Sequence, residues 1–409
     1  MIAKNTKTNM VLITVCLTLG SVFLYAMNSS IRNNYGIMLN SIMNNAGISF
    51  TDVSFVLAVG QLIFGLVQPI FGILASKKGN SLTLVIGALL TLTGILLIPF
   101  CKSALSLMIC LGFILPSGTG AISFGIIMGA ITPKLPEKSV PTVSGIVNAS
   151  NGIGNTVMSP IINSLIVTGG LLHGMLILAI PSALMIPISL LLGKNKKKAP
   201  ENIEKKQVVT PPPVDTKLLF ENAFKNRTYI CLMLGFLTCG FHMALITNHL
   251  PTQLTSYGFS SEVAAYAFSI YGITTIIGSI LSGSLCGKVK MKDVLGTFYG
   301  LRPITILIFL LSPKNMITIT LFTAFLGFSG SSTVPPVSGI VGKTFGTINL
   351  ATLFGFAFFI HQIGGFFGAW LGGICFYSTG SYDLIWIADI LLSAMAAIVS
   401  FIIRDSKTV

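Results

Sequence analysis

Apolar stretches alternate with short polar turns along the whole 409-residue chain. Each stretch is close to the roughly 20 residues that an α-helix needs to cross the hydrocarbon core of a bilayer. Twelve such windows centre near residues 22, 63, 91, 118, 155, 182, 239, 274, 303, 325, 363 and 394. The pattern predicts an all-α membrane protein with twelve transmembrane helices. The first stretch starts near Met10 and is too long for a cleavable signal, so we expect it to be the first of these helices.

One polar segment interrupts the pattern and divides the chain. Residues 194–226 contain four lysines between 194 and 198, further Glu and Lys residues and a run of three prolines, without apolar periodicity. This composition cannot form a packed core and is typical of a linker. We expect an N-terminal six-helix bundle over residues 1–193, a cytoplasmic linker over residues 194–226 and a C-terminal six-helix bundle over residues 227–409.

Composition and charge placement support a membrane location. Only 9% of the residues are charged and 53% are hydrophobic, with a mean hydropathy of +0.86. These values exclude an ordinary water-soluble protein of this length. The net charge of +14 is compatible with nucleic-acid binding, but 21 of the 25 Lys and Arg residues fall in tails and loops on one side of the predicted bundle. This is the positive-inside pattern, so we expect both termini in the cytoplasm, lipid as a partner and no nucleic acid.

Motifs of soluble enzymes and metal proteins are absent. The chain has no GxxxxGK[ST] phosphate loop, no HExxH spacing and no CxxC pair among its seven cysteines. ATP-driven transport, a metal site and an enzyme are therefore disfavoured, and no cofactor is expected.

The two predicted bundles show a weak internal repeat. A shift of 211 residues aligns Gly72 with Gly283 and Lys77 with Lys288, around the second helix of each bundle. The turn Gly72-Ile-Leu-Ala-Ser-Lys77-Lys78-Gly79 resembles the G-x-L-a-D-r-x-G-r/k signature of the major facilitator superfamily. The resemblance implies a fold of two parallel six-helix repeats, a solute site between them, and a conformational role for Gly72, Lys77, Lys78 and Gly79. Ser76 stands where that family usually has the Asp that latches its outward-open state.

Three further segments resemble the monocarboxylate-porter branch of that family and its bacterial relatives. They are residues 25–39, with a basic residue before an aromatic–Gly–apolar run, residues 240–251, and residues 358–364. The resemblance implies a proton-coupled symporter for small organic anions, functional as a monomer in a bacterial inner membrane. One departure is that the eighth predicted helix, residues 265–283, has no charged residue, whereas those porters carry an Asp/Arg pair there.

Arg32 is the candidate anchor for an anionic solute. A charge at the bilayer centre costs at least about 2.5–3.5 kcal/mol on insertion scales, so it requires a reason. No Asp or Glu occurs in the predicted middle of the helices that line the pathway in this family, and the guanidinium fork matches a carboxylate. The alternative is an arginine capped by backbone carbonyls or reaching the outer face.

Three other titratable groups are candidates for proton coupling. His242 and His361 fall near the middle of the seventh and eleventh helices, and histidine titrates near neutral pH. The alternative for each is a neutral histidine hydrogen-bonded between helices. Asp389, in the twelfth helix, is a further coupling candidate for which a structural role is favoured. Arg302, in the ninth helix, is expected to reach lipid headgroups on the inner side.

Polar residues on the remaining pore-type helices complete the candidate site. We expect solute contact from Asn28, Asn151, Tyr271 and Gln362, with interhelical hydrogen bonding as the alternative for each.

Two other functions stay open. The first is an efflux carrier for a larger anionic or neutral metabolite, such as a siderophore-like compound or drug. The second, a receptor on a carrier fold, would need a signalling domain that the short tails and the 33-residue linker do not supply.

Overall fold

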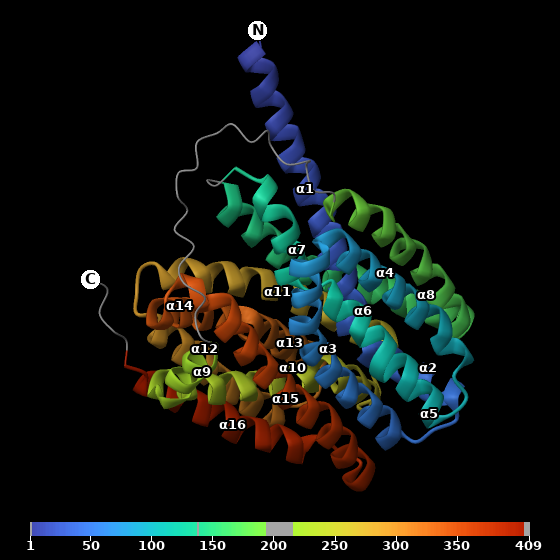
Figure 1. The fold of residues 1–409 in the computed structure, drawn as a ribbon. Coiled ribbons are helices and arrows are strands. Elements are labelled where there is room, and N and C mark those ends of the chain that lie inside the picture. Colours follow the sequence, from blue (N-terminus) through green and yellow to red (C-terminus); the bar gives the residue numbers. More distant parts are fainter. Residues whose placement is uncertain (1, 137–138, 194–215, 405–409) are drawn as a thin grey trace.

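A computed structural model of the chain describes residues 2–136, 139–193 and 216–404. These residues form helices joined by short turns, and no strand occurs among them (Figure 1). The N-terminal half contains α1 (Ile2–Asn33), α2 (Tyr35–Ala46), α3 (Phe50–Lys78), α4 (Asn80–Leu97), η1 (Ile98–Phe100), α5 (Ala104–Leu107), η2 (Met108–Ile114), α6 (Leu115–Ala121), α7 (Phe124–Ile131), η3 (Thr132–Lys134) and α8 (Val140–Gly193). The C-terminal half contains α9 (Thr216–Lys225), α10 (Arg227–Ser256), α11 (Ser261–Cys286), α12 (Met291–Leu311), α13 (Met316–Gly330), η5 (Ser331–Thr333), α14 (Val334–Phe345), α15 (Thr347–Thr379) and α16 (Asp383–Ile402).

The helices confirm the predicted membrane architecture. Eleven helical stretches of the described residues are long and apolar enough to cross a bilayer, and all twelve predicted centres fall within them. The stretch Gly145–Gly193 has 49 residues and holds two of those centres. Its backbone turns at Gly170, where φ is 74°, a value that favours glycine. It therefore crosses twice, which gives twelve crossings and places the start of α1 and the end of α16 at the same face.

We call this face the terminal face and the opposite one the loop face. Large apolar side chains cover the outside of the bundle between the two faces, as a lipid-exposed surface requires. Examples are Leu311, Ile317 and Leu391, which are 79%, 72% and 67% exposed.

The helix starts agree with the predicted repeat. Ser49 accepts a hydrogen bond from Asp52 N to cap α3, and Ser260, 211 positions later, accepts one from Val263 N to cap α11. The next helices, α4 and α12, begin at Asn80 and Met291, which differ by the same 211 positions. Side-chain caps supply acceptors for N–H groups that have no partner inside the helix, so the two halves begin corresponding helices in the same way.

The two halves meet along α3 with α15 and along α8 with α11, and α2 packs on α10 near the loop face. A β-carbon on Gly36 of α2 would lie 2.5 Å from the carbonyl oxygen of Thr247 on α10, and one on Gly373 of α15 would overlap the side chain of Ser54 on α3. The halves are therefore in tight contact near the loop face. Toward the terminal face, α7 packs on helices of the N-terminal half, and α14 packs on helices of the C-terminal half. Helices α7 and α14 lie apart from each other in Figure 1.

The predicted linker ends in a helix. Residues 194–215 lie outside the described residues, but α9 covers residues 216–225 and packs on α10. The ring of Phe220 packs edge to face with that of Phe356 of α15, and the ring of Phe224 contacts both Phe356 and Tyr229. Residues 216–225 are thus held against the C-terminal half by aromatic contacts. The polar composition of the whole segment 194–226 did not indicate these contacts.

Close packing of α10 on α15 generates a stability prediction. A β-carbon on Gly364 would overlap the carbonyl oxygen of Leu237, and one on Gly240 would overlap that of His361. We expect Gly364→Ala to lower the free energy of unfolding in detergent by about 2 kcal/mol or more, because backbone atoms cannot move aside. The control is Gly283→Ala, where a β-carbon meets nothing within 4 Å. That variant is expected to be neutral or slightly more stable, and equal effects from the two substitutions would contradict the packing argument.

Candidate functional site

The first membrane helix is interrupted between the two faces, and the break positions Arg32. Helices α1 and α2 lie on either side of Asn34, whose φ of −102° and ψ of 13° are not helical. The Asn34 side chain stabilises this break. Its Nδ2 donates to the backbone oxygen of Ser30 at 2.7 Å, and its Oδ1 accepts from Ser159 Oγ of α8 at 2.6 Å. Broken helices within a membrane occur where the backbone is buried in protein or lines a solute path. Arg32 is in the last turn of α1, where the helix carbonyls favour a positive charge.

The Arg32 guanidinium has no carboxylate partner in the part of the chain that the structure describes. Nη1 donates to Oε1 of Gln61 on α3 at 3.4 Å, and Cζ lies 4.3 Å from the centre of the Phe64 ring. Within residues 2–136, 139–193 and 216–404, no Asp or Glu oxygen lies within 4.0 Å of it. A cavity of about 10 Å³ adjoins the group and is lined by Arg32, Tyr35, Gly60, Gln61, Phe64, Pro116 and Thr119. It has room for about one water molecule, so Arg32 is a cation with one amide acceptor and little free space.

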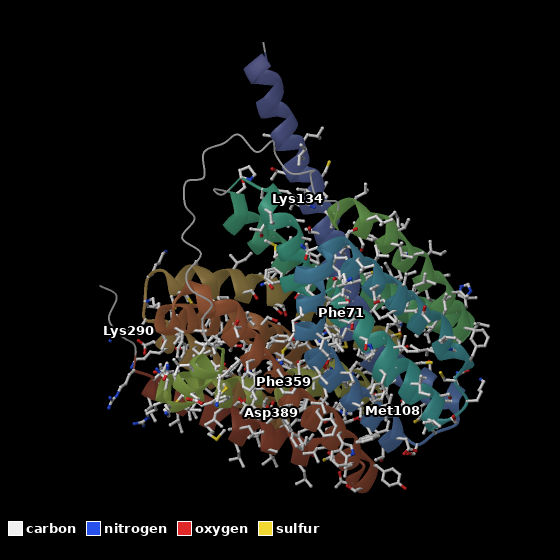
Figure 2. All side chains as sticks on the ribbon, in the orientation of Figure 1. Phe71, Met108, Lys134, Lys290, Phe359 and Asp389 are labelled. Carbon is white, nitrogen blue, oxygen red and sulfur yellow. The ribbon has the colours of Figure 1, made fainter. Side chains whose placement is uncertain are left out.

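Gln61 connects Arg32 to the C-terminal half. Its Oε1 accepts from Nε2 of Gln362 on α15 at 3.3 Å as well as from Arg32. Nδ1 of His361 lies 2.9 Å from Oε1 of Gln362. Both glutamines are buried, and Phe359, one turn from Gln362, lies where α15 faces α3 (Figure 2). The four polar side chains therefore form one path from α1 through α3 to α15, which we call the central polar path.

A second polar group is enclosed within the C-terminal half. Nδ1 of His242 on α10 lies 2.5 Å from Oδ2 of Asp389 on α16, and neither side chain is exposed. Asp389 Oδ1 accepts from Ser393 Oγ at 3.4 Å, and Asp389 lies among the helices of the C-terminal half (Figure 2). Nε2 of His242 is buried without a hydrogen-bond partner among the described residues. The pair joins α10 to α16 and leaves one ring nitrogen available to a proton.

Arg302 lies in the same interior, and its predicted contact with lipid headgroups is wrong. The side chain has no exposed surface. Nη2 donates to the carbonyl oxygens of Ser329 and Gly330 at 3.2 and 2.9 Å and to Cys239 Sγ at 3.3 Å. Asp389 is close enough to interact with it electrostatically. Carbonyl oxygens at the end of α13 hold Nη2 of this α12 residue inside the bundle, whereas Nε and Nη1 are buried without a hydrogen-bond partner among the described residues.

The remaining candidates differ in what they contact. Asn28 Nδ2 donates to Thr119 O and Ile122 O at 3.1 and 3.2 Å, so this amide ties α1 to the fourth membrane crossing. Asn151 Oδ1 accepts from Asn33 Nδ2 at 3.0 Å, between α8 and α1. Tyr271 is buried in α11, donates to Met243 Sδ at 3.3 Å and lies within electrostatic range of Arg32. The structure thus brings Gln362 and His361 to Arg32, whereas Asn28 and Asn151 are engaged within the N-terminal half.

The signature turn has the expected compact form. Helix α3 ends at Lys78, and α4 begins at Asn80, with Gly79 alone between them. Gly79 has φ 95°, a conformation that residues with a β-carbon rarely adopt. Gly72 has open space around its Cα, and the Lys77 side chain lies outside the described residues. The conformational role of Gly72, Lys77, Lys78 and Gly79 stays a prediction.

Sequence reasoning missed two features of the site. Gln61 is a polar residue inside an apolar membrane helix, the same signal that singled out Gln362. The pairing of Asp389 with His242 had a weaker signal, because the predicted membrane helices contain several basic or titratable residues that could be the partner of Asp389. Which of them it meets depends on helix tilt and rotation, and these are set by packing.

The Arg302 contacts predict a structural role. We expect Arg302→Lys to lower the free energy of unfolding in detergent by about 3 kcal/mol, because an ammonium cannot reach the same acceptors from a flexible stem. Arg404→Lys, at an exposed position, serves as the control and should change stability by less than about 0.5 kcal/mol. Wild-type stability of Arg302→Lys would show that the carbonyl contacts do not hold the bundle.

Known proteins resemble this chain along most of its length. The sequence profile of the Major Facilitator Superfamily matches residues 18–301 and 232–409. The uncharacterized MFS-type transporter YcxA of Bacillus subtilis (strain 168) is 22% identical over 391 residues, which cover 93% of this chain and 92% of that protein. Monocarboxylate transporter 12 of Xenopus laevis is 25% identical over 356 residues, which cover 81% of this chain and 75% of that protein.

A solved structure has the same fold. The crystal structure of a D-xylose-proton symporter superposes with a TM-score of 0.73 at 13% identity and covers 96% of this chain and 97% of that one. At this identity the likeness concerns the fold alone. Because the family profile covers nearly the whole chain and the fold agrees, the protein is a transporter of the Major Facilitator Superfamily.

Proposed function

We propose that the protein is a secondary active transporter of small organic anions, coupled to protons and working by alternating access. The observation that carries this proposal is Arg32, a cation between the two faces that has no acidic partner among the described side chains. An arginine there requires negative charge from elsewhere, and a carboxylate supplies it in a geometry that fits the guanidinium fork. The similarity to proteins named monocarboxylate transporters supports the same solute class.

Alternating access needs two halves that can separate at one face while they meet at the other. The contacts of Gly36 with α10 and of Gly373 with α3 bring the halves together near the loop face. Basic residues such as Lys134, Lys288 and Lys343 follow or end helices at the terminal face. We therefore infer that the terminal face is cytoplasmic and that the described conformation is closed toward the outside. The bacterial inner membrane and the monomeric state remain predictions.

His242 and Asp389 are the proposed coupling pair. Nδ1 of His242 is held 2.5 Å from Asp389 Oδ2, and Nε2 has no hydrogen-bond partner among the described residues, so we assign the coupling proton to Nε2. With Asp389 charged and His242 neutral, the carboxylate balances the Arg302 guanidinium, and an added proton leaves a net positive charge in the bundle. Because the pair joins α10 to α16, its protonation alters the packing between these helices. His361, on the central polar path, is the alternative proton carrier.

Uptake by proteoliposomes tests the solute class. Labelled acetate, lactate, pyruvate and benzoate are offered with and without an inward proton gradient, and we expect saturable, gradient-stimulated uptake of at least one acid. Arg32→Gln should weaken its apparent affinity by about 10- to 100-fold, the range expected for loss of a charge-assisted bidentate contact. Lys102→Gln, which removes a positive charge near the loop face, should leave affinity unchanged. No uptake of any acid would favour the efflux carrier for a larger metabolite.

The coupling pair is tested separately from binding. In Asp389→Asn and His242→Gln, we expect stimulation by the proton gradient to fall at least about tenfold, because the pair can no longer bind and release a proton. Exchange of labelled for unlabelled acid across the membrane, which needs no net proton movement, should persist. His361→Gln is measured in parallel. Full gradient stimulation in all three variants would remove these residues from the coupling mechanism.

A further inference from the structure

Gln61 is at the junction between the proposed solute anchor and the contact of the two halves. Its Oε1 accepts from Arg32 Nη1 of α1 at 3.4 Å and from Gln362 Nε2 of α15 at 3.3 Å. Gly65, one turn further along α3, has no side chain, and a β-carbon there would lie 2.8 Å from Gln362 Cγ. The absence of that side chain allows Gln362 to lie across α3 and reach Gln61. One amide oxygen thus serves both the cation and the interface.

This amide oxygen is a weak substitute for a carboxylate. A carboxylate brings a charge opposite to that of the guanidinium and offers two oxygens to the fork, whereas Gln61 offers one uncharged oxygen. The long distance of 3.4 Å between Arg32 and Gln61 indicates a loose contact. An incoming carboxylate therefore competes successfully with Gln61 for Arg32.

Space makes this competition obligatory. The cavity of about 10 Å³ beside Arg32 admits about one water, which is far smaller than a carboxylic acid. The cavity is also lined by Tyr35, Phe64 and Pro116, whose side chains are bulky or rigid. Gln61, which lines the cavity and is the acceptor of the guanidinium, has a flexible side chain that can move aside. A solute that binds the guanidinium in this cavity has to displace the Gln61 amide. This displacement removes the side-chain acceptor of Gln362 and leaves its Nε2 with the backbone carbonyl oxygen of Gln61, 3.4 Å away, as the remaining acceptor on α3.

We propose that Gln61 is a latch that the solute releases: its amide oxygen occupies the anion position on Arg32 and holds α3 to α15 through Gln362 until a carboxylate replaces it. The proposal rests on the anion-transport function proposed above and adds a residue that transmits solute binding to the interface of the halves. Solute binding at Arg32 then weakens the α3–α15 contact from within, which allows the closed loop face to open.

The chain contains its own reporter of this contact. Trp370 of α15 packs on Phe55 of α3, with ring centroids 5.5 Å apart, whereas the second tryptophan, Trp386, is buried in the C-terminal half and donates to Gln253 Oε1 at 2.8 Å. The emission of Trp370 therefore responds to separation of α3 from α15. A Trp386→Phe background leaves Trp370 as the single tryptophan. If that background fails to fold, the difference spectrum between the parent protein and Trp370→Phe isolates the same signal.

The test compares Gln61→Leu, Gln61→Glu and Gln362→Leu in detergent, without ligand and during titration with lactate as the probe acid. Gln61→Leu removes the latch and frees Arg32, so Trp370 emission should shift without ligand and lactate should bind about threefold more tightly. Gln362→Leu should produce the same shift in emission and should also bind lactate more tightly, by up to about threefold, because the acid no longer has to break the contact between Gln61 and Gln362. Gln61→Glu supplies a permanent carboxylate, so it should show no ligand-free shift and bind lactate at least about tenfold more weakly.

Opposite effects of the two Gln61 variants on affinity distinguish a latch from a residue that only maintains structure. The proposal is overturned if Gln61→Leu and Gln61→Glu weaken lactate binding by similar factors, or if ligand-free Gln61→Leu and Gln362→Leu keep the parent emission. The ligand-free arm does not depend on the solute class. If lactate and the other three acids neither bind nor are taken up, the proposed function fails. The Trp370 emission of the ligand-free variants still tests whether Gln61 holds α3 to α15.

Discussion

A charged side chain inside a bilayer finds no water, so its hydrogen bonds come from the protein or from a bound solute, and this constraint separates the two membrane arginines. Arg302 has no exposed surface and donates to two carbonyl oxygens and a cysteine sulfur of neighbouring helices. Arg32 is half-buried and donates to one amide oxygen. The same functional group therefore joins helices of the C-terminal bundle in one place, whereas at the boundary of the halves it is the proposed anchor for a solute.

Glycine determines how closely these groups approach. Gly240 and Gly364 bring the backbones of α10 and α15 into contact, because neither position has room for a β-carbon. This contact orients α15 so that His361 and Gln362 are directed along the path toward Gln61 and Arg32. In a membrane, where apolar burial does not favour helix association over lipid contact, such close packing is a main source of cohesion.

In the proposed mechanism, the solute acts through the central polar path and the proton acts through the His242–Asp389 pair. The central polar path crosses the interface of the halves, so whatever binds Arg32 acts on that interface directly. The His242–Asp389 pair is enclosed within one half and connects α10 to α16. A proton bound there acts on the shape of the C-terminal half, and α10 and α15, which pack tightly together, connect the two groups physically.

The twelve crossings and the compact turn at Gly79 could be predicted from the sequence, because hydrophobic length and backbone-restricted glycines are local properties. Arg32 could also be selected as a candidate from the sequence, since a charge in an apolar stretch requires a reason wherever it points. Its acceptor Gln61 and the pairing of Asp389 with His242 could not be predicted in this way, and Arg302 was assigned to the wrong environment. These outcomes depend on the tilt and rotation of each helix about its axis. Packing against helices far away in the chain sets both tilt and rotation. The spacing of residues along one helix does not show which neighbouring helix a polar side chain will contact.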